Sequence, residues 1–259
     1  MGTSHIKSAE RVLDVLDLLA RRSDPVTARE VSAALNLPKS TTHHLLNVMR
    51  DRHFLAYRAD HRAWTLGTAA FEMGAAYLRN GPLGFEGQRF LAELTRRTNE
   101  TSHLAVLRGT DVVYLGKQEP PVPGIRLVTE IGTRLPAHLT AVGRAMLAQT
   151  PLGLLTALYT GYDWPDLTGV GPHSLAALRS LLDTDRERGS ACEEGSITPG
   201  IACVASAVHA RDGAPIAAVG VAFVAAAQTV TSTEGLTAEV RRVAADFSLA
   251  LSEGPPVGQ

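Results

Sequence analysis

A polar stripe lies on one side of the helix that residues 39–51 are expected to form. Helical spacing places five polar side chains on one face: Ser40, His43, His44, Asn47 and Arg50. The opposite face is apolar and holds Leu45, Leu46, Val48 and Met49. Hydroxyl, imidazole, amide and guanidinium groups form hydrogen bonds with base edges and phosphates in a major groove about 12 Å wide. The pattern predicts a helix that packs by one side and contacts DNA by the other.

The first turn of this helix and a second basic segment extend the predicted contact with DNA. Lys39, Ser40 and Thr41 begin the helix, where free N–H groups and the helix dipole favour a phosphate. A polar turn between two short strands carries further basic groups: Arg58, His61 and Arg62. A solvated polar face on a small helical bundle is the alternative interpretation. The basic hairpin favours DNA contact instead.

Cysteine and histidine side chains could support other chemistry. Cys203 could be a nucleophile with His138 or His209 as its base, but its apolar neighbours in the sequence favour an inert buried thiol. A metal site would require Cys192, Cys203, His103 and His138 to converge, and no C-x-x-C or H-x-x-H spacing supports one. We therefore expect no catalytic residues, no metal ligands and no cofactor.

The composition is that of a globular protein. Hydrophobic residues make up 45% of the chain and charged residues 20%. There is no apolar run long enough to span a membrane, and residues 1–20 lack the hydrophobic block of a signal peptide. The two cysteines are too few for a disulfide framework. We expect a cytoplasmic protein without a membrane partner.

The charge is unevenly distributed along the chain. Residues 1–80 contain 11 Lys and Arg against 8 Asp and Glu, a net of +3. Residues 81–259 contain 14 against 18, a net of −4. A mildly basic front and an acidic rear suit a DNA-binding module that is joined to a domain without DNA contacts.

The elements that position the polar stripe precede it in the sequence. Residues 8–21 are expected to form a helix with one apolar face. Thr27 and Glu30 have the spacing of a capping box, which predicts the start of a short second helix. Residues 36–38 form a tight turn that ends in proline, and the helix over 39–51 follows. This arrangement predicts a helix-turn-helix.

A hairpin and one more helix complete the first part of the chain. The hairpin is expected over residues 54–66, with Trp64 packed beneath it rather than stacked on a base. The helix is expected over 67–80, where Gly81 and Pro82 end it and mark a boundary. We predict three parts: a winged helix-turn-helix over 1–67, a linker helix over 68–81, and a second domain over 82–254.

The second domain mixes strands and helices. Strands are expected over residues 102–107, 112–118, 125–131, 201–209 and 215–224. Helices are expected over 85–98, 141–149, 151–159, 174–188 and 237–251. Grouped antiparallel strands with helices before and after them favour an α+β fold over a parallel, doubly wound sheet.

Three blocks of sequence, in this order, resemble the IclR-type transcriptional regulators. The first block comprises IKSAER at 6–11, LPKSTTH at 37–43 and WTLG at 64–67. The second is LPAHLTAVGRAMLA at 135–148, and the third is Gly189, PGI at 199–201 and Cys203. The resemblance covers nearly the whole chain. It implies a winged helix-turn-helix, a linker helix used in dimerisation, and a C-terminal effector-binding and oligomerisation domain with an antiparallel sheet of GAF or profilin-like fold.

The resemblance also implies partners and site residues. Such regulators bind palindromic double-stranded operators as homodimers or homotetramers and act as repressors or activators. The recognition-helix positions carried over are Lys39, Ser40, Thr41, His43 and His44. The family usually has arginine at the position of His44, so we expect weaker phosphate anchoring or another base preference there. The implied lining of the effector pocket is Leu127, Ala141, Val142, Glu193, Cys203, Gly220 and Ala222.

Two of these positions bear on the effector. Relatives that bind small hydrophilic acids tend to have serines where this chain has Gly220 and Ala222. A larger and less polar cavity suits a bulkier ligand, so we hypothesise an aromatic acid. Backbone N–H groups where the Ala141 helix starts would hold its carboxylate. Glu193 would repel that carboxylate unless it bonds a hydroxyl elsewhere on the ligand. Two alternatives remain: a second domain that serves only assembly, and an enzyme with an appended DNA module.

Overall fold

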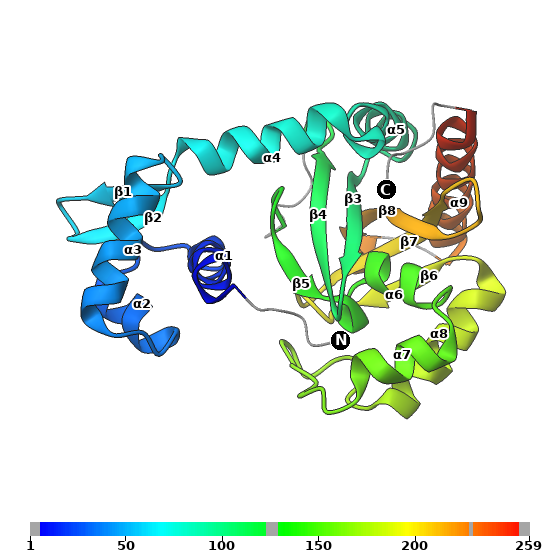
Figure 1. Ribbon diagram of the computed structural model, residues 1–259. Coiled ribbons are helices and arrows are strands. Elements are labelled where there is room, and N and C mark those ends of the chain that lie inside the picture. Colours follow the sequence, from blue (N-terminus) through cyan, green and yellow to red (C-terminus); the bar gives the residue numbers. More distant parts are fainter. Residues whose placement is uncertain (1–5, 123–128, 228–229, 254–259) are drawn as a thin grey trace. The chain divides into compact units, whose positions relative to one another are not determined.

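The computed structural model describes residues 6–122, 129–227 and 230–253 (Figure 1). The contacts divide the chain into two compact units, and the division falls between Arg79 and Asn80. Within the described residues, one cluster of buried apolar residues belongs to the first unit and two belong to the second. Each unit therefore has the kind of core that a domain requires.

The first unit is a small helical bundle with a two-stranded hairpin. It contains α1 (Lys7–Ala20), α2 (Ala28–Ala34), α3 (Lys39–Asp51), β1 (Leu55–Arg58), β2 (Ala63–Leu66) and α4 (Thr68–Asn80). The apolar faces of the helices meet the hairpin in a core that includes Val15, Leu19, Val31, Leu46, Met49, Leu55 and Trp64. The winged helix-turn-helix expected from the sequence is confirmed. Its three helices lie within one residue of the expected bounds.

A capping box starts α2, as the spacing of Thr27 and Glu30 predicted. The Glu30 N–H donates to the Thr27 hydroxyl oxygen at 3.3 Å, and the Thr27 N–H donates to the Glu30 carboxylate at 2.7 Å. These hydrogen bonds lower the pKa of Glu30 because they favour its charged form. Two backbone donors at the N-terminus of this short helix are thereby satisfied.

The start of α4 is fixed by the turn that follows α3. The Ala69 N–H donates to the carbonyl oxygen of His53 at 3.0 Å, and the Gly67 N–H donates to the carbonyl of Phe54 at 2.7 Å. A Cβ atom on Gly67 would overlap the same His53 carbonyl oxygen. Glycine is therefore the residue that lets the chain pass from the hairpin into α4 at this distance.

The second unit is built on an antiparallel sheet. The described strands are β3 (Thr101–Arg108), β4 (Asp111–Gln118), β5 (Arg134–Pro136), β6 (Ala191–Glu194), β7 (Ile201–His209) and β8 (Pro215–Val224). In the described part of the chain they form one six-stranded sheet in the order β5-β4-β3-β8-β7-β6. All of its pairs are antiparallel, which confirms the expected α+β class.

Helices cover both faces of this sheet. One face packs on α5 (Pro82–Thr98) and α9 (Val230–Glu253) through a core that includes Phe90, Leu104, Val219 and Phe247 (Figure 1). The other face packs on α6 (Ala141–Leu147), α7 (Leu152–Tyr159) and α8 (Leu175–Arg188). The second core includes Ala105, Val142, Leu147, Leu178 and Ala205. The unit is thus a sheet between two helical layers.

A buried ion pair joins α6 to α8. The guanidinium of Arg144 donates two hydrogen bonds, each 2.8 Å long, to the carboxylate of Asp185. The exposed fractions of these two residues are 7% and 2%. Charges so deeply buried are tolerated because the two hydrogen bonds form a bidentate pair. Removal of either residue would leave the charge of the other buried without a counter-charge.

Some expected elements differ from the structure. The strand predicted over 125–131 lies outside the described residues from 125 to 128, and residues 129–131 are not in a strand. The strands β5 and β6 were not predicted, because three and four residues are too few to show an alternating pattern. Helices α5 and α9 begin earlier than expected, and α6 ends two residues earlier. Pro82 stands in the first turn of α5, where proline needs no hydrogen-bond acceptor.

Candidate functional site

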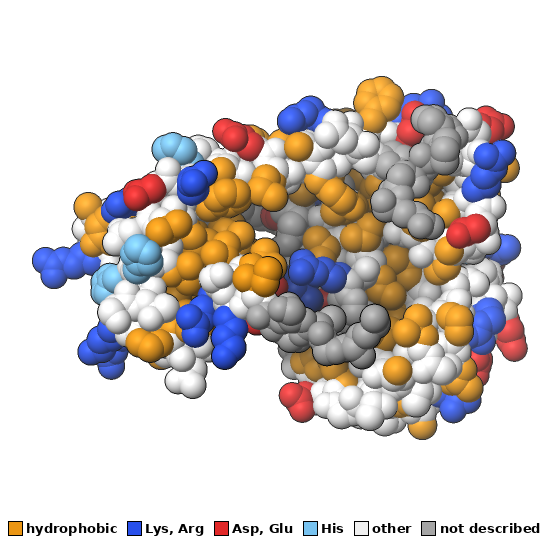
Figure 2. Space-filling model, in the orientation of Figure 1, with side chains coloured by type: hydrophobic (Ala, Val, Ile, Leu, Met, Phe, Trp, Pro, Cys, Tyr) orange, Lys and Arg blue, Asp and Glu red, His pale blue; other side chains and the backbone are white. Residues whose placement is uncertain are grey.

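One face of α3 is open to solvent and the other is buried in the first unit. Thr42, Leu46 and Met49 are buried. The predicted polar stripe is exposed at Ser40, His43, His44 and Arg50 and half-buried at Asn47. Figure 2 shows histidine and basic side chains on the visible surface of this unit. The helix therefore has the two-sided character that contact with a groove requires.

The prediction that Val48 faces inward is wrong. Its side chain is 45% exposed and lies on the edge of the polar face. Thr42 takes an inward position instead, because its hydroxyl donates to the carbonyl oxygen of Pro38 at 3.1 Å and so can be buried. An internal hydrogen bond of this kind makes a threonine compatible with an apolar core.

The N-terminus of α3 is open as well. Its N-cap residue, Pro38, has no side chain that could bond the first N–H groups. Lys39 and Ser40 are exposed there, and Thr41 is half-buried. These backbone donors, together with the ammonium group of Lys39, are suited to a phosphate oxygen.

The hairpin places its basic residues on the surface beside Asp60, an acidic residue of the same turn. Arg58 donates to the carboxylate of Asp60 at 3.1 Å, and His61 lies 3.4 Å from the same carboxylate. This contact lowers the pKa of Asp60, with the Arg58 hydrogen bond as its main cause. Arg62 ends the turn with a positive φ of 50° and is exposed. Trp64 is 5% exposed and packs against Tyr57, with ring centroids 5.1 Å apart, so it belongs to the core as expected.

The second unit contains a cavity between the sheet and the start of α6. Its empty volume is about 510 Å³, counting the space open to solvent at its mouth. Six of the seven positions expected to line an effector pocket lie on its wall: Ala141, Val142, Glu193, Cys203, Gly220 and Ala222. The seventh, Leu127, lies outside the described residues.

The small residues of the sheet create this space. Gly220 pairs with Ala205 on one side and His103 on the other, and Ala222 pairs with Cys203. A Cβ atom on Gly220 would lie 2.6 Å from the carbonyl oxygen of Val204. Any larger residue there would push β7 and β8 apart, so glycine at this position is also a packing requirement.

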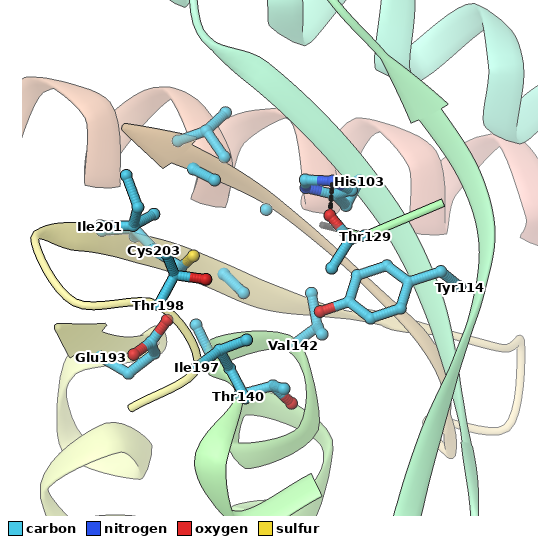
Figure 3. Close-up of a pocket in the computed structure, with 16 residues that line it drawn as sticks. His103, Tyr114, Thr129, Thr140, Val142, Glu193, Ile197, Thr198, Ile201 and Cys203 are labelled. Carbon is cyan, nitrogen blue, oxygen red and sulfur yellow. Dashed lines mark hydrogen bonds between the residues drawn. The ribbon is translucent and has the colours of Figure 1, made fainter. Parts of the chain in front are cut away.

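One end of the cavity is acidic. Glu193 and Cys203 are direct cross-strand partners, and both line the cavity (Figure 3). The Ser196 N–H donates to the Glu193 carboxylate at 3.1 Å. Glu193 is 5% exposed, and burial raises the pKa of its carboxyl. Burial beside this carboxyl also raises the pKa of Cys203 well above its ordinary value, so the thiol keeps its proton.

The other end is formed by three residues that the sequence did not single out as ligand contacts. His103 Nε2 and the Thr129 hydroxyl are 2.9 Å apart, and the His103 ring meets the edge of Tyr114 at a centroid distance of 5.3 Å. Burial lowers the pKa of His103 to about 3, and the nearby Lys117 ammonium adds to this effect. The sequence offered a histidine and a tyrosine inside predicted strands as signals. They indicate ligand contacts only when the position of the cavity is known.

The cysteine and histidine residues considered for other chemistry do not converge. Cys192 packs toward α5 and α9, whereas Cys203 packs toward α6 on the opposite face. His138 is buried among Tyr159, Tyr162 and Trp164. Among the residues that the structure describes, no three His, Cys, Asp or Glu side chains are placed to hold a metal ion. None of the described helices has the length and apolar character that crossing a membrane requires.

Comparisons with known proteins identify both units. Residues 8–59 match the IclR helix-turn-helix domain, and residues 75–249 match the bacterial transcriptional regulator IclR C-terminal domain. The chain belongs to the IclR family of transcriptional regulators. The HTH-type transcriptional regulator XynR of Escherichia coli is 32% identical over 213 residues, which are 82% of this chain and 84% of that protein. The family resemblance of the three sequence blocks is thus confirmed.

Solved structures share the fold. An IclR-type transcriptional regulator from Alicyclobacillus acidocaldarius aligns with a TM-score of 0.82 at 24% identity, over 96% of this chain and all of that chain. An IclR homologue from Microbacterium hydrocarbonoxydans, solved in complex with 4-hydroxybenzoate, aligns with a TM-score of 0.75 at 22% identity, over 94% of this chain and 98% of that chain. As an IclR-family member, the chain is a DNA-binding transcriptional regulator.

Proposed function

We propose that this regulator binds its operator through α3 and the hairpin, and that a small aromatic acid in the cavity modulates that binding. The observation that carries the first part is the exposed polar face of α3 above a buried apolar face. Proposed contacts with base edges and phosphates come from Lys39, Ser40, Thr41, His43, His44, Asn47, Arg58 and Arg62. These groups are polar or basic, as direct and phosphate contacts require.

Three features support an aromatic acid as the effector. The floor of the cavity is apolar, because Gly220, Ala222 and Ala205 present almost no side chain. Glu193 at one end accepts hydrogen bonds and would repel a carboxylate, so it suits a ligand hydroxyl. The Microbacterium relative of the same fold is named as a complex with 4-hydroxybenzoate, which has both a hydroxyl and an acid group on one ring.

The start of α6 contributes less than the sequence suggested. The N–H of Gly143 already donates to the Thr140 hydroxyl at 3.0 Å, and the N–H of Arg144 donates to the Thr140 carbonyl. Capping therefore uses part of the first turn, which was expected to hold a carboxylate. Thr140, Ala141 and Val142 nevertheless line the cavity beside the sheet.

We propose that self-association through α4 links effector binding in the second unit to operator binding by the first. None of the residues of α4 is buried, and its apolar side chains Phe71, Met73 and Tyr77 are 77%, 62% and 56% exposed. A helix of this kind gains stability when a second copy covers it. A homodimer or homotetramer would place recognition helices in major grooves about 34 Å apart. An effector shifts this spacing only through a difference in its affinity for two arrangements.

Calorimetric titration of the full-length chain with aromatic and short aliphatic acids tests the effector. We expect 4-hydroxybenzoate to bind more tightly than glyoxylate or pyruvate and to change operator affinity in a gel-shift assay. Tighter binding of the small acids would refute an aromatic effector. No binding by any acid would favour a second unit that serves only assembly, and turnover of a bound acid would favour an enzyme.

Salt dependence of operator binding tests the DNA contacts. We expect Arg62→Ala to weaken binding to all sequences and to reduce the slope of log affinity against log salt by about 1, because one phosphate contact is lost. Arg79→Ala, a basic residue at the end of α4, is the matched control. An unchanged slope for Arg62→Ala would show that the hairpin does not contact DNA.

A further inference from the structure

Three polar side chains are buried at the end of the cavity opposite Glu193. His103, Tyr114 and Thr129 are 6%, 6% and 8% exposed, and all three line the cavity wall. They come from β3, from β4 and from the segment before β5. Figure 3 shows the Tyr114 hydroxyl directed toward the cavity and Thr129 beside His103, with Glu193 at the far side. The cavity thus has two polar ends and an apolar floor between them.

The hydrogen bonds at this end are incomplete. His103 Nε2 is bonded to the Thr129 hydroxyl at 2.9 Å. Among the described residues, no hydrogen bond to the Tyr114 hydroxyl is found, although this side chain is almost fully buried. Burial raises the pKa of Tyr114, so its O–H keeps the proton and remains a donor. The Tyr114 hydroxyl oxygen is not among the fully buried atoms that lack a partner, so it can donate to an acceptor in the cavity that Tyr114 lines.

Among the described residues, the cation that acts on His103 is already engaged. The ammonium group of Lys117 lies 2.9 Å from the carboxylates of both Glu119 and Glu130. Its side chain is only 9% exposed, and its strand position is paired with that of His103. A ligand anion at this end would therefore be held by neutral hydroxyl donors rather than by an ion pair with Lys117. Donors fixed in a desolvated site bind an anion well without a formal positive charge.

We infer that the hydroxyl groups of Tyr114 and Thr129 bind the acid group of the effector, and that His103 is the residue that positions Thr129. This inference rests on the proposed function. It assigns an orientation to the ligand: the acid group lies toward β4 and the hydroxyl lies toward Glu193. The inference assigns His103 the tautomer with its proton on Nε2: this N–H donates to the Thr129 hydroxyl oxygen, which leaves the threonine O–H free to donate into the cavity.

Titrations with two probes test the acid-binding role. The probes are 4-hydroxybenzoate and 4-methylphenol, which keeps the ring and hydroxyl but lacks the acid group. We expect Tyr114→Phe and Thr129→Val each to weaken binding of 4-hydroxybenzoate about tenfold or more, the usual effect of losing a hydrogen bond to a charged group. Binding of 4-methylphenol should change by less than about twofold, since the lost donors face the acid group. Tyr159→Phe, which removes a buried hydroxyl outside this cavity, is the control.

A second set of variants tests the positioning role of His103. His103→Leu should weaken 4-hydroxybenzoate binding as much as Thr129→Val does, and the double variant should lose no more than either alone. His103→Gln should restore most of the affinity, because its amide can donate where Nε2 does. Thr129→Ser should bind as the wild type does, which keeps the test decisive if His103→Leu fails to fold. Additive losses in the double variant would show that His103 does not act through Thr129.

The outcomes separate this inference from the proposed function. If acids bind the wild type and bind Tyr114→Phe and Thr129→Val equally well, the acid-binding role is refuted and the proposed effector stands. If both probes lose affinity equally in these variants, the hydroxyls act on the shape of the cavity and the assignment is again refuted. If no acid binds the wild type, the proposed effector and this assignment fall together.

Discussion

Glu193, which we propose as an effector-binding residue, carries a buried carboxyl whose charged form lowers the stability of the fold. Its carboxyl is almost fully buried, and the Ser196 N–H donates to it at 3.1 Å. Burial raises its pKa above the ordinary 4.5, which means that the folded state disfavours the charged form. The contribution of the protonated Glu193 carboxyl to folding stability is therefore fully present below pH 4.5. It is lost as the pH rises through the raised pKa.

Replacing this carboxyl should change the pH dependence of stability. Glu193→Gln keeps an oxygen that accepts from Ser196 but has no charge to bury, so we expect a higher Tm at pH 7 and a flatter Tm between pH 5 and 7. Its exposed neighbour Glu194 supplies the control, because Glu194→Gln should leave the profile unchanged. Equal profiles for wild type and Glu193→Gln would mean that the charge is not disfavoured by folding. Thermal unfolding at several pH values measures this.

At the scale of single elements, one glycine just before α4 and one glycine within it have opposite surroundings. Gly67 precedes the helix and has the His53 carbonyl in the place of a Cβ atom. Gly74 lies inside the helix with open space around it. The first glycine allows a close approach of backbone, whereas the second only lowers helix propensity.

Alanine substitutions should therefore have opposite signs. Gly67→Ala should destabilise the first unit by about 1–3 kcal/mol, because the methyl group forces the α3 turn and α4 apart. Gly74→Ala should stabilise it by about 0.8–1 kcal/mol through helix propensity. Urea unfolding of both variants measures the two effects. A stabilising Gly67→Ala would show that the approach to His53 is not a constraint.

The connection between α6 and α8 makes a second prediction at this scale. Asp185→Asn should cost about 3–5 kcal/mol, because the Arg144 guanidinium would stay buried without its counter-charge. Replacing both residues together, as Arg144→Met with Asp185→Leu, should recover most of that loss since no charge remains buried. Denaturant unfolding of the second unit distinguishes these cases. A double variant as unstable as Asp185→Asn would show that the unpaired charge of Arg144 is not the cause of the lost stability.

At the scale of the whole molecule, exposed apolar surface on α4 bears on assembly. Phe71→Asp places a charge where a second copy is proposed to pack, so we expect weaker self-association and, as a result, weaker binding to a palindromic operator. Leu154→Asp, at an apolar position of α7 that is 55% exposed, is the control and should associate as the wild type does. Sedimentation velocity and gel shifts measure the two quantities. Unchanged association of Phe71→Asp would place the interface elsewhere.

Local patterns in the sequence were sufficient for most elements. The capping box at Thr27 and Glu30, the turn before Lys39 and the apolar spacing of α3 act over a few residues, so their meaning does not depend on distant parts of the chain. The long hairpin strands β7 and β8 were predicted with their observed bounds for the same reason. The motif blocks were sufficient to recognise the family.

Tertiary structure decided what depends on distant neighbours. Val48 is exposed and Thr42 is buried because a hydrogen bond to Pro38 and the packing of the bundle choose the inward face. The polar end of the cavity joins His103, Tyr114 and Thr129, which are up to 26 residues apart. The sequence alone determined the two-sided helix and the family, since those signals are local. The residues that line the cavity are brought together by strand pairing across the sheet, which spacing along the chain does not reveal.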